Sequence, residues 1–305
     1  MKIRLSMFVL PQEIDAYEGI VKQLKVNSTL IEELEVEMDV TLSLSDQLMN
    51  WNECKLPKSY FEDKFVALTR FFDWANPASR FDVSEDDWVL GCVSKRRQSW
   101  QDMSDDTIAM TVLDCDIVFP MHTLYYIEQS IKHLQGLDYW ALTPEIIRIW
   151  DGTWDELVNE NYMDRDNFFH KTADVYTIVN DPYLMEKGGE LRTLNNAKFS
   201  GGWMTTISKK LLDLTTIPQE FGHYGLEDTY VMACMNQMKR AGITADQYVM
   251  EGLIVCENYL YRDDEYLTKY LSNIDRRKEY LSVAEAAFGS AVAEFGRSKI
   301  HGAKK

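Results

Sequence analysis

The sequence predicts an α/β fold with a central sheet flanked by helices and a helical extension at its C-terminal end. Residues 107–113 are apolar at consecutive positions, as is typical of a strand covered on both faces. Segments of strand character alternate along the chain with segments whose apolar residues recur at helical spacing. The length of 305 residues is sufficient for one large domain of this class or two small ones.

The first elements follow from apolar periodicity. We expect a strand at 3–10, a helix at 13–25, a strand at 31–44 and a helix at 58–74. The apolar residues of the second helix fall on one face and are expected in the core: Phe61, Phe65, Leu68, Phe71 and Phe72. The acidic stretch 76–90 is expected to be a solvated loop.

The later elements follow from the same signals. We expect a helix over about 120–135, a strand at 138–142, a helix near 207–214, a helix ending at about 240 and a strand at 247–255.

Two further segments are distinguished by composition. Residues 150–190 are rich in Asp, Asn, Tyr and Trp with little periodicity, and we expect them to face a substrate. The chain from 262 onward is strongly charged, and 280–297 is expected to be helical.

Composition excludes several classes of function. The formal net charge is -17, from 49 acidic and 32 basic residues, and such a surface repels nucleic acids and anionic membranes. No apolar run reaches transmembrane length. The five cysteines are scattered and lack Cys-x-x-Cys spacing, which argues against a disulfide framework and a structural zinc site. A reducing, cytoplasmic location is expected.

Asp114 and Asp116 directly follow the apolar strand at 107–113. The carboxyl ends of strands are where open α/β sheets bind ligands, and two such carboxylates can share one divalent cation through hard oxygen ligands. Pro120 suits the opening of the next helix. The alternative for this Asp-x-Asp pair is a solvated turn.

A second acidic pair, Glu227 and Asp228, follows Gly222 and Gly225. The glycines permit unusual backbone angles, and the carboxylates fall in the expected first turn of a helix, where the positive end of the helix dipole stabilises anions. The alternative for this pair is ordinary helix capping.

The ordered set of Asp-x-Asp after a strand, a Ser200-Gly201-Gly202 turn and a Gly-x-Gly-Leu-Glu-Asp helix start resembles the GT-A fold glycosyltransferases, especially the inverting family 2 and its relatives. The strand, proline-containing turn and helix over 3–25 look like the opening of that family. The resemblance covers most of residues 1–260 and implies a Rossmann-like, mixed central sheet.

The resemblance implies that Asp114 and Asp116 bind Mn²⁺ or Mg²⁺ against the diphosphate of a nucleotide sugar, with Asp116 as the direct ligand. It implies that Asp228 is the general base that takes a proton from an acceptor hydroxyl. Glu227 would then hydrogen-bond the acceptor or the donor sugar. A divalent ion stabilises the charge that grows on a departing nucleoside diphosphate.

The same resemblance suggests further donor contacts. Gly201 and Gly202 match a turn that lets the backbone approach the donor, and Trp203 could cover a sugar face or be a core aromatic. Arg96 and Arg97 lie where family members often place a basic residue near the pyrophosphate, although a surface pair is an equal expectation.

The sequence departs from the family in two places. Only Asp46 follows the second expected strand as a candidate for the base or ribose, and no histidine stands in the late stretch 255–258. His223, Glu257 or His301 could serve as a third metal ligand, and none of them is assigned.

The resemblance therefore implies a domain at 1–260, with a nucleotide-binding half at 1–120 and an acceptor-binding half at 121–260, followed by a charged helical extension at 261–305. The implied activity is transfer of a sugar, such as a hexose, from a UDP- or GDP-sugar to a glycan or other hydroxyl acceptor, with inversion.

Two other readings stay open. The strand ending in Asp114 also resembles the first motif of haloacid-dehalogenase-like phosphatases, in which the first Asp is a nucleophile, although that motif normally lies near the N-terminus. The 8 Trp and 16 Tyr residues suit a noncatalytic carbohydrate-binding protein.

Overall fold

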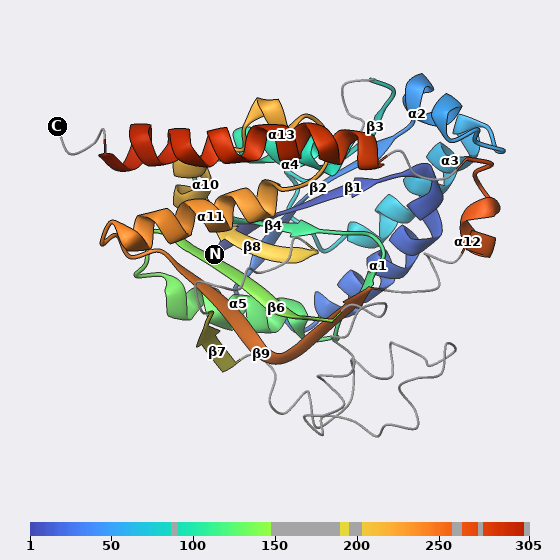
Figure 1. The fold of residues 1–305 in the computed structure, drawn as a ribbon. Helices are drawn as coiled ribbons and strands as arrows, with labels where there is room; N and C mark the ends of the chain where they lie inside the picture. Colours follow the sequence, from blue (N-terminus) through green and yellow to red (C-terminus); the bar gives the residue numbers. More distant parts are fainter. Residues whose placement is uncertain (87–90, 148–189, 195–202, 258–263, 274–276, 302–305) are drawn as a thin grey trace, which may run out of the picture.

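The fold is known from a computed structural model that describes residues 1–86, 91–147, 190–194, 203–257, 264–273 and 277–301. Its centre is a nine-stranded sheet in the order β3-β2-β1-β4-β8-β6-β9-β5, with β7 paired to β9. Helices cover both faces of this sheet (Figure 1). The residues expected to face a substrate, 150–190, lie outside the described part of the chain except for Glu190.

One half of the sheet is parallel. Strands β1 (Lys2–Val9), β2 (Glu35–Ser43), β3 (Arg80–Ser84) and β4 (Thr107–Leu113) run in the same direction. Their carboxyl ends therefore meet at one edge of the sheet, and the segment after Leu113 starts there.

The other half is mixed. Strand β8 (Met204–Ser208) runs antiparallel to both β4 and β6 (Trp140–Ile147), whereas β9 (Asp246–Glu257) is parallel to β6. The short strands β5 (Ile117–Val118) and β7 (Glu190–Thr193) pair antiparallel with β9.

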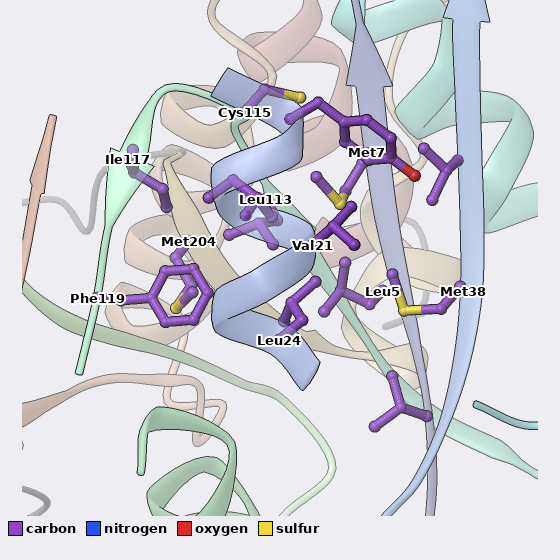
Figure 2. Packing of buried hydrophobic residues seen from close by; sticks show 14 of the residues in the cluster. Leu5, Met7, Val21, Leu24, Met38, Leu113, Cys115, Ile117, Phe119 and Met204 are labelled. Carbon is purple, nitrogen blue, oxygen red and sulfur yellow. The ribbon is translucent and has the colours of Figure 1, made fainter. Parts of the chain in front are cut away.

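Helices α1 (Ile14–Asn27), α3 (Lys58–Thr69) and α5 (Thr123–Leu134) bury their apolar faces in one cluster with alternate residues of β1 and β2. Figure 2 shows Val21 and Leu24 of α1 lying over this layer. Truncating one such buried side chain to Ala typically costs about 2–5 kcal/mol.

Helices α4 (Cys92–Gln101), α10 (Lys209–Thr215), α11 (Glu227–Arg240) and α13 (Arg277–Phe295) contribute to a second apolar cluster. In Figure 1, α13 runs across the top of the view, and it packs against α11. The C-terminal helix is thus part of a core and not a detached appendage.

The remaining described helical segments are short. They are η1 (Pro11–Glu13), α2 (Asp46–Trp51), η2 (Arg70–Phe72), η3 (Gln219–Phe221), α12 (Asp264–Thr268) and η5 (Gly296–His301).

The residues of β1 and β2 that point toward α4 are polar and buried. Lys95 of α4 pairs with Asp39 of β2 at 2.5 Å, and Arg4 pairs with Glu37 and donates to the Ser99 carbonyl at 2.6 Å. Each buried charge has an opposite partner, which offsets its desolvation. Charged residues alternate with apolar ones in β2 because the two faces of this strand meet different layers.

The predicted α/β class is confirmed: a parallel half, a mixed central sheet flanked by helices and a helical C-terminal part. Strand β4 is buried on both faces, with Ala109 and Leu113 in one apolar cluster and Met110 and Val112 in the other. Four cysteines with described side chains are free, namely Cys54, Cys92, Cys115 and Cys234.

Two expectations in the N-terminal half were wrong. Residues 76–90 contain β3 and not only a loop, because pairing with β2 satisfies the backbone of a polar edge strand. Phe71 is 41% exposed, because the α-helix ends at Thr69 and the chain then tightens into η2.

Two boundaries in the second half also differ. Strand β6 continues past Pro144, where the ladder with β9 changes register, since an irregular position tolerates a residue without an N–H donor. The helix expected near 207 begins after strand β8, and the Ser208 hydroxyl caps it by accepting from the Leu211 amide at 3.4 Å.

Candidate functional site

Asp114, Cys115 and Asp116 form the link between β4 and β5 at the carboxyl edge of the parallel strands. The Asp114 amide donates to the Trp203 carbonyl at 2.9 Å, which continues the ladder between β4 and β8 by one step. The Asp114 side chain is 33% exposed, whereas Asp116 is 7% exposed. The predicted position of this pair, directly after a buried strand, is confirmed.

Helix α4 brings Arg96 to this link. Its guanidinium donates to Asp114 Oδ1 at 2.7 Å through Nη2 and to Glu227 Oε1 through Nη1. Burial alone would lower the pKa of Arg96. The carboxylates of Glu227 and Asp114 raise it by more than burial lowers it, so the pKa lies well above its usual value. Arg96 therefore stays protonated and is not the exposed surface residue that was the alternative expectation.

The second acidic pair lies in the first turn of α11, as predicted. Gly222 has φ +69°, Gly225 has φ +89° and Leu226 has φ +65°. A left-handed Leu is strained and persists only where surrounding contacts hold it, and such residues are concentrated at functional sites. Gly225 is also tightly packed, because a Cβ there would lie 2.6 Å from Leu281 Cδ1 of α13.

The turn before α11 is attached to the start of α4. The Val93 amide donates to the His223 carbonyl at 3.0 Å, and Ser94 Oγ lies 2.7 Å from His223 Nδ1. These contacts join segments far apart in sequence and determine where Glu227 meets Arg96.

Asp228 is half-buried, and its Oδ1 accepts from the Thr229 amide at 2.6 Å and from the Thr229 hydroxyl at 3.2 Å. Burial, followed by the negative charge of Glu227, raises the pKa of Asp228 above its ordinary value. A carboxylate with a raised pKa is a better proton acceptor, which is the property required of a general base.

Arg97, one position further along α4, points to a different part of the chain. Its guanidinium donates to the carbonyl oxygens of Ile217, Pro218 and Gly222 at 3.2, 2.6 and 3.4 Å. Arg97 therefore fixes the segment that leads into the turn before α11.

The other predicted residues are placed as follows. Trp203 is 9% exposed and belongs to the core cluster beneath α1, which matches the core alternative. Gly201 and Gly202 lie outside the described residues. Asp46 begins α2 just beyond β2 and pairs with Lys58 at 2.6 Å.

The residues present provide oxygen ligands of the kind that Mn²⁺ and Mg²⁺ accept. In the described part of the chain, no group of three or more His, Cys, Asp and Glu side chains is placed to hold a metal ion. A cation held by the two carboxylates of Asp114 and Asp116 would therefore need its remaining ligands from a bound diphosphate or from water.

Helix α4 was not predicted from the sequence. The contacts of Gly91 and Ser94 with His223, and the ion pair of Lys95 with Asp39, were not predicted either. The helix is polar along most of its length, so apolar periodicity does not reveal it. A usable signal was the run Lys95-Arg96-Arg97, since three consecutive basic residues in so acidic a chain need acidic partners.

No protein-family model matches the chain, and no curated protein sequence matches it. Several solved structures are similar in fold. One is a mycobacterial protein, with 14% identity over 98% of this chain and 75% of that one and a TM-score of 0.44. Similarity of this degree concerns only the path of the chain.

Two other solved structures have a similar chain path. S. aureus TarS 1–349 in complex with UDP has 12% identity over 97% of this chain and 70% of that one, with a TM-score of 0.46. A UDP-glucose pyrophosphorylase from Acinetobacter has 11% identity over 97% and 93%, with a TM-score of 0.42.

Among the described residues, none of the helices combines the length and apolar character needed to cross a bilayer.

Proposed function

We propose that this protein is an enzyme acting on nucleotide sugars, and specifically a glycosyltransferase that moves a sugar from a UDP- or GDP-sugar to a hydroxyl acceptor with inversion. One observation carries the proposal: Arg96 joins Asp114, at the end of β4, to Glu227, beside Asp228 at the start of α11. Two acidic groups far apart in sequence thereby accept from the two terminal nitrogens of one guanidinium.

This arrangement suits a displacement reaction with a leaving group on one side and an attacking hydroxyl on the other. On the leaving-group side, Asp114 and Asp116 would hold Mn²⁺ or Mg²⁺, which supplies Lewis-acid stabilisation of a departing diphosphate. The acidic link itself would repel that diphosphate, so positive charge is required there.

On the acceptor side, Asp228 would take the hydroxyl proton as the oxygen attacks the anomeric carbon. Its raised pKa favours proton acceptance, and its position in the first turn of α11 keeps the carboxylate form available through the helix dipole. Glu227 pairs with Arg96 and so holds the first turn of the helix, and Asp228 in the same turn would face the acceptor.

The decisive experiment is a melting-temperature screen of the full chain with UDP- and GDP-sugars, each with MnCl₂ and with EDTA. The proposal expects stabilisation by at least one nucleotide sugar in the presence of Mn²⁺, because a ligand that binds only the folded state raises the melting temperature. Transfer is then assayed with that donor.

Two further measurements, a phosphatase assay and a melting-temperature screen of free glycans, separate the alternatives. Release of phosphate from a generic aryl phosphate without any response to nucleotide sugars would support a phosphatase instead. Stabilisation by free glycans alone would indicate a noncatalytic carbohydrate-binding protein. Either result contradicts the proposed transferase.

A further inference from the structure

Arg96 is the meeting point of three elements of the fold. It belongs to α4, and its two carboxylate partners belong to the end of β4 and to the start of α11. Arg96 is 6% exposed, and the Glu227 side chain is 7% exposed. The ion pair with Glu227 is therefore largely shielded from water, whereas the Asp114 side of the bridge is partly open.

The charges around Arg96 explain why a cation is needed there. Arg96 pairs with Asp114 and with Glu227, and each of these carboxylates has a second acidic residue close to it in the sequence, Asp116 and Asp228. Like charges repel strongly where they are shielded from water, and a buried carboxylate without an opposite charge lowers the stability of the folded state. The positive charge of Arg96 offsets this repulsion where the two acidic segments meet.

We propose that Arg96 is the internal counter-cation of Asp114, and that it competes with a divalent ion for this carboxylate when no nucleotide is bound. The inference rests on the proposed function in assigning Asp114 to a cation. One oxygen of Asp114 already accepts a hydrogen bond from Arg96. A free divalent ion must therefore compete with Arg96 for one of its two carboxylate ligands, Asp114 and Asp116. Divalent ions in this class need about six oxygen ligands. Metal alone should therefore bind weakly, and metal with a diphosphate should bind well.

Arg97 provides a matched control on the same helix. Both residues are arginines of α4, and replacing either by Gln removes one positive charge. The guanidinium of Arg97 donates to backbone carbonyls and not to a carboxylate. Its removal should destabilise the fold without making a carboxylate available to a metal ion.

The experiment measures melting temperatures of the wild-type chain, Arg96→Gln and Arg97→Gln in MnCl₂ and in EDTA, with no nucleotide present. We expect no Mn²⁺-dependent change in the wild type or in Arg97→Gln. Arg96→Gln should melt lower in EDTA and regain about 3–6 °C in millimolar Mn²⁺, as expected for a new ligand of the folded state.

A second variant keeps the inference testable if Arg96→Gln does not fold. The double variant Arg96→Gln with Glu227→Gln removes the buried carboxylate together with its partner and leaves Asp114 without its arginine. It should fold and should also gain a Mn²⁺ response.

Two results would overturn the inference: stabilisation of the wild type by Mn²⁺ alone to the same extent as the variants, or folded Arg96 variants that do not respond to Mn²⁺. These results are independent of the nucleotide-sugar screen. A wild type whose melting temperature does not change with nucleotide sugars would contradict the proposed function. The comparison of variants in Mn²⁺ without nucleotide tests only the role of Arg96.

Discussion

The backbone of Gly91, which precedes α4, lies directly against the backbone of His223, which precedes α11. A Cβ on Gly91 would overlap the His223 carbonyl group. The φ of Gly91 is an ordinary extended angle of −161°, so the requirement for glycine is one of space and not of backbone conformation. This contact sets the distance between the two helices that carry Arg96 and Glu227.

Gly91→Ala should therefore destabilise the protein by about 1–3 kcal/mol, the usual range for overpacking. It should also weaken the response to nucleotide sugars, because α4 and the turn before α11 must separate. Urea unfolding and the melting screen measure the two effects. Gly136→Ala is the control, because nothing lies within 4 Å of a Cβ at that position. Equal stability of the two variants would show that the contact is not constraining.

Asp116→Ala should abolish the Mn²⁺-dependent stabilisation by a nucleotide sugar, because it removes one of two carboxylates proposed to hold the ion. The wild type and the variant are compared by melting temperature with donor, in MnCl₂ and in EDTA. Asp106→Ala is the matched control, since Asp106 precedes the opposite end of β4 and its side chain is 71% exposed. A variant that retains the full Mn²⁺ response would remove Asp116 from the site.

Asp228→Asn should leave donor binding intact and reduce transfer by about 10²–10⁴-fold, the typical contribution of a general base. Donor binding is measured by melting temperature, and transfer by release of the nucleoside diphosphate. Asp105→Asn, an exposed residue before β4, should behave like the wild type. Loss of both donor binding and transfer in Asp228→Asn would point to a structural role and against catalysis.

The raised pKa of Asp228 also predicts an effect on stability. A carboxyl whose pKa is raised on folding contributes stability that is present below the ordinary value of 3.8 and is lost as the pH rises through the raised pKa. At neutral pH, Asp228→Asn should therefore be more stable than the wild type, and the difference should vanish below pH 3.8. Urea unfolding at a series of pH values measures this. A variant less stable than the wild type at neutral pH would contradict the stated pKa direction.

The contribution of Asp15, on α1, to the free energy of unfolding should depend on pH in the opposite direction to that of Asp228. Burial raises the pKa of Asp15, but Lys64, Tyr270 and Lys269 outweigh this effect and hold the pKa at about 2. A lowered pKa gives stability that is present above pH 3.8 and is lost as the pH falls through about 2. Asp15→Asn should cost about 2 kcal/mol at neutral pH, from roughly 1.36 kcal/mol per pKa unit.

The control for Asp15→Asn is Asp63→Asn, an exposed position on α3. The contacts of Asp15 tie Lys269 and Tyr270, which follow α12, to α1 and α3. Limited proteolysis near residue 270 should therefore be faster in Asp15→Asn. Unchanged proteolysis together with unchanged stability would mean that this cluster does not hold the C-terminal segment.

The sequence alone located about half of the elements of the fold, including the long helices and the central strand β4. Apolar spacing located α1, α3, α5 and α11, because a helix that covers a sheet must present one apolar face. The unbroken apolar run located β4 as a strand covered on both faces, and so placed Asp114 and Asp116 at the carboxyl edge of the parallel strands. The glycines before Glu227 predicted an unusual turn, which the positive φ angles of Gly222 and Gly225 confirm.

Only the tertiary structure decided how these parts meet. The strand character of β3 depends on its partner β2, and the polar sequence of α4 is explained by buried charges on the sheet beneath it. The bridge from Asp114 through Arg96 to Glu227 joins three segments far apart in sequence. Periodicity reports which face of each element is buried, whereas ion pairs and close backbone contacts depend on which elements become neighbours, and local sequence does not contain that information.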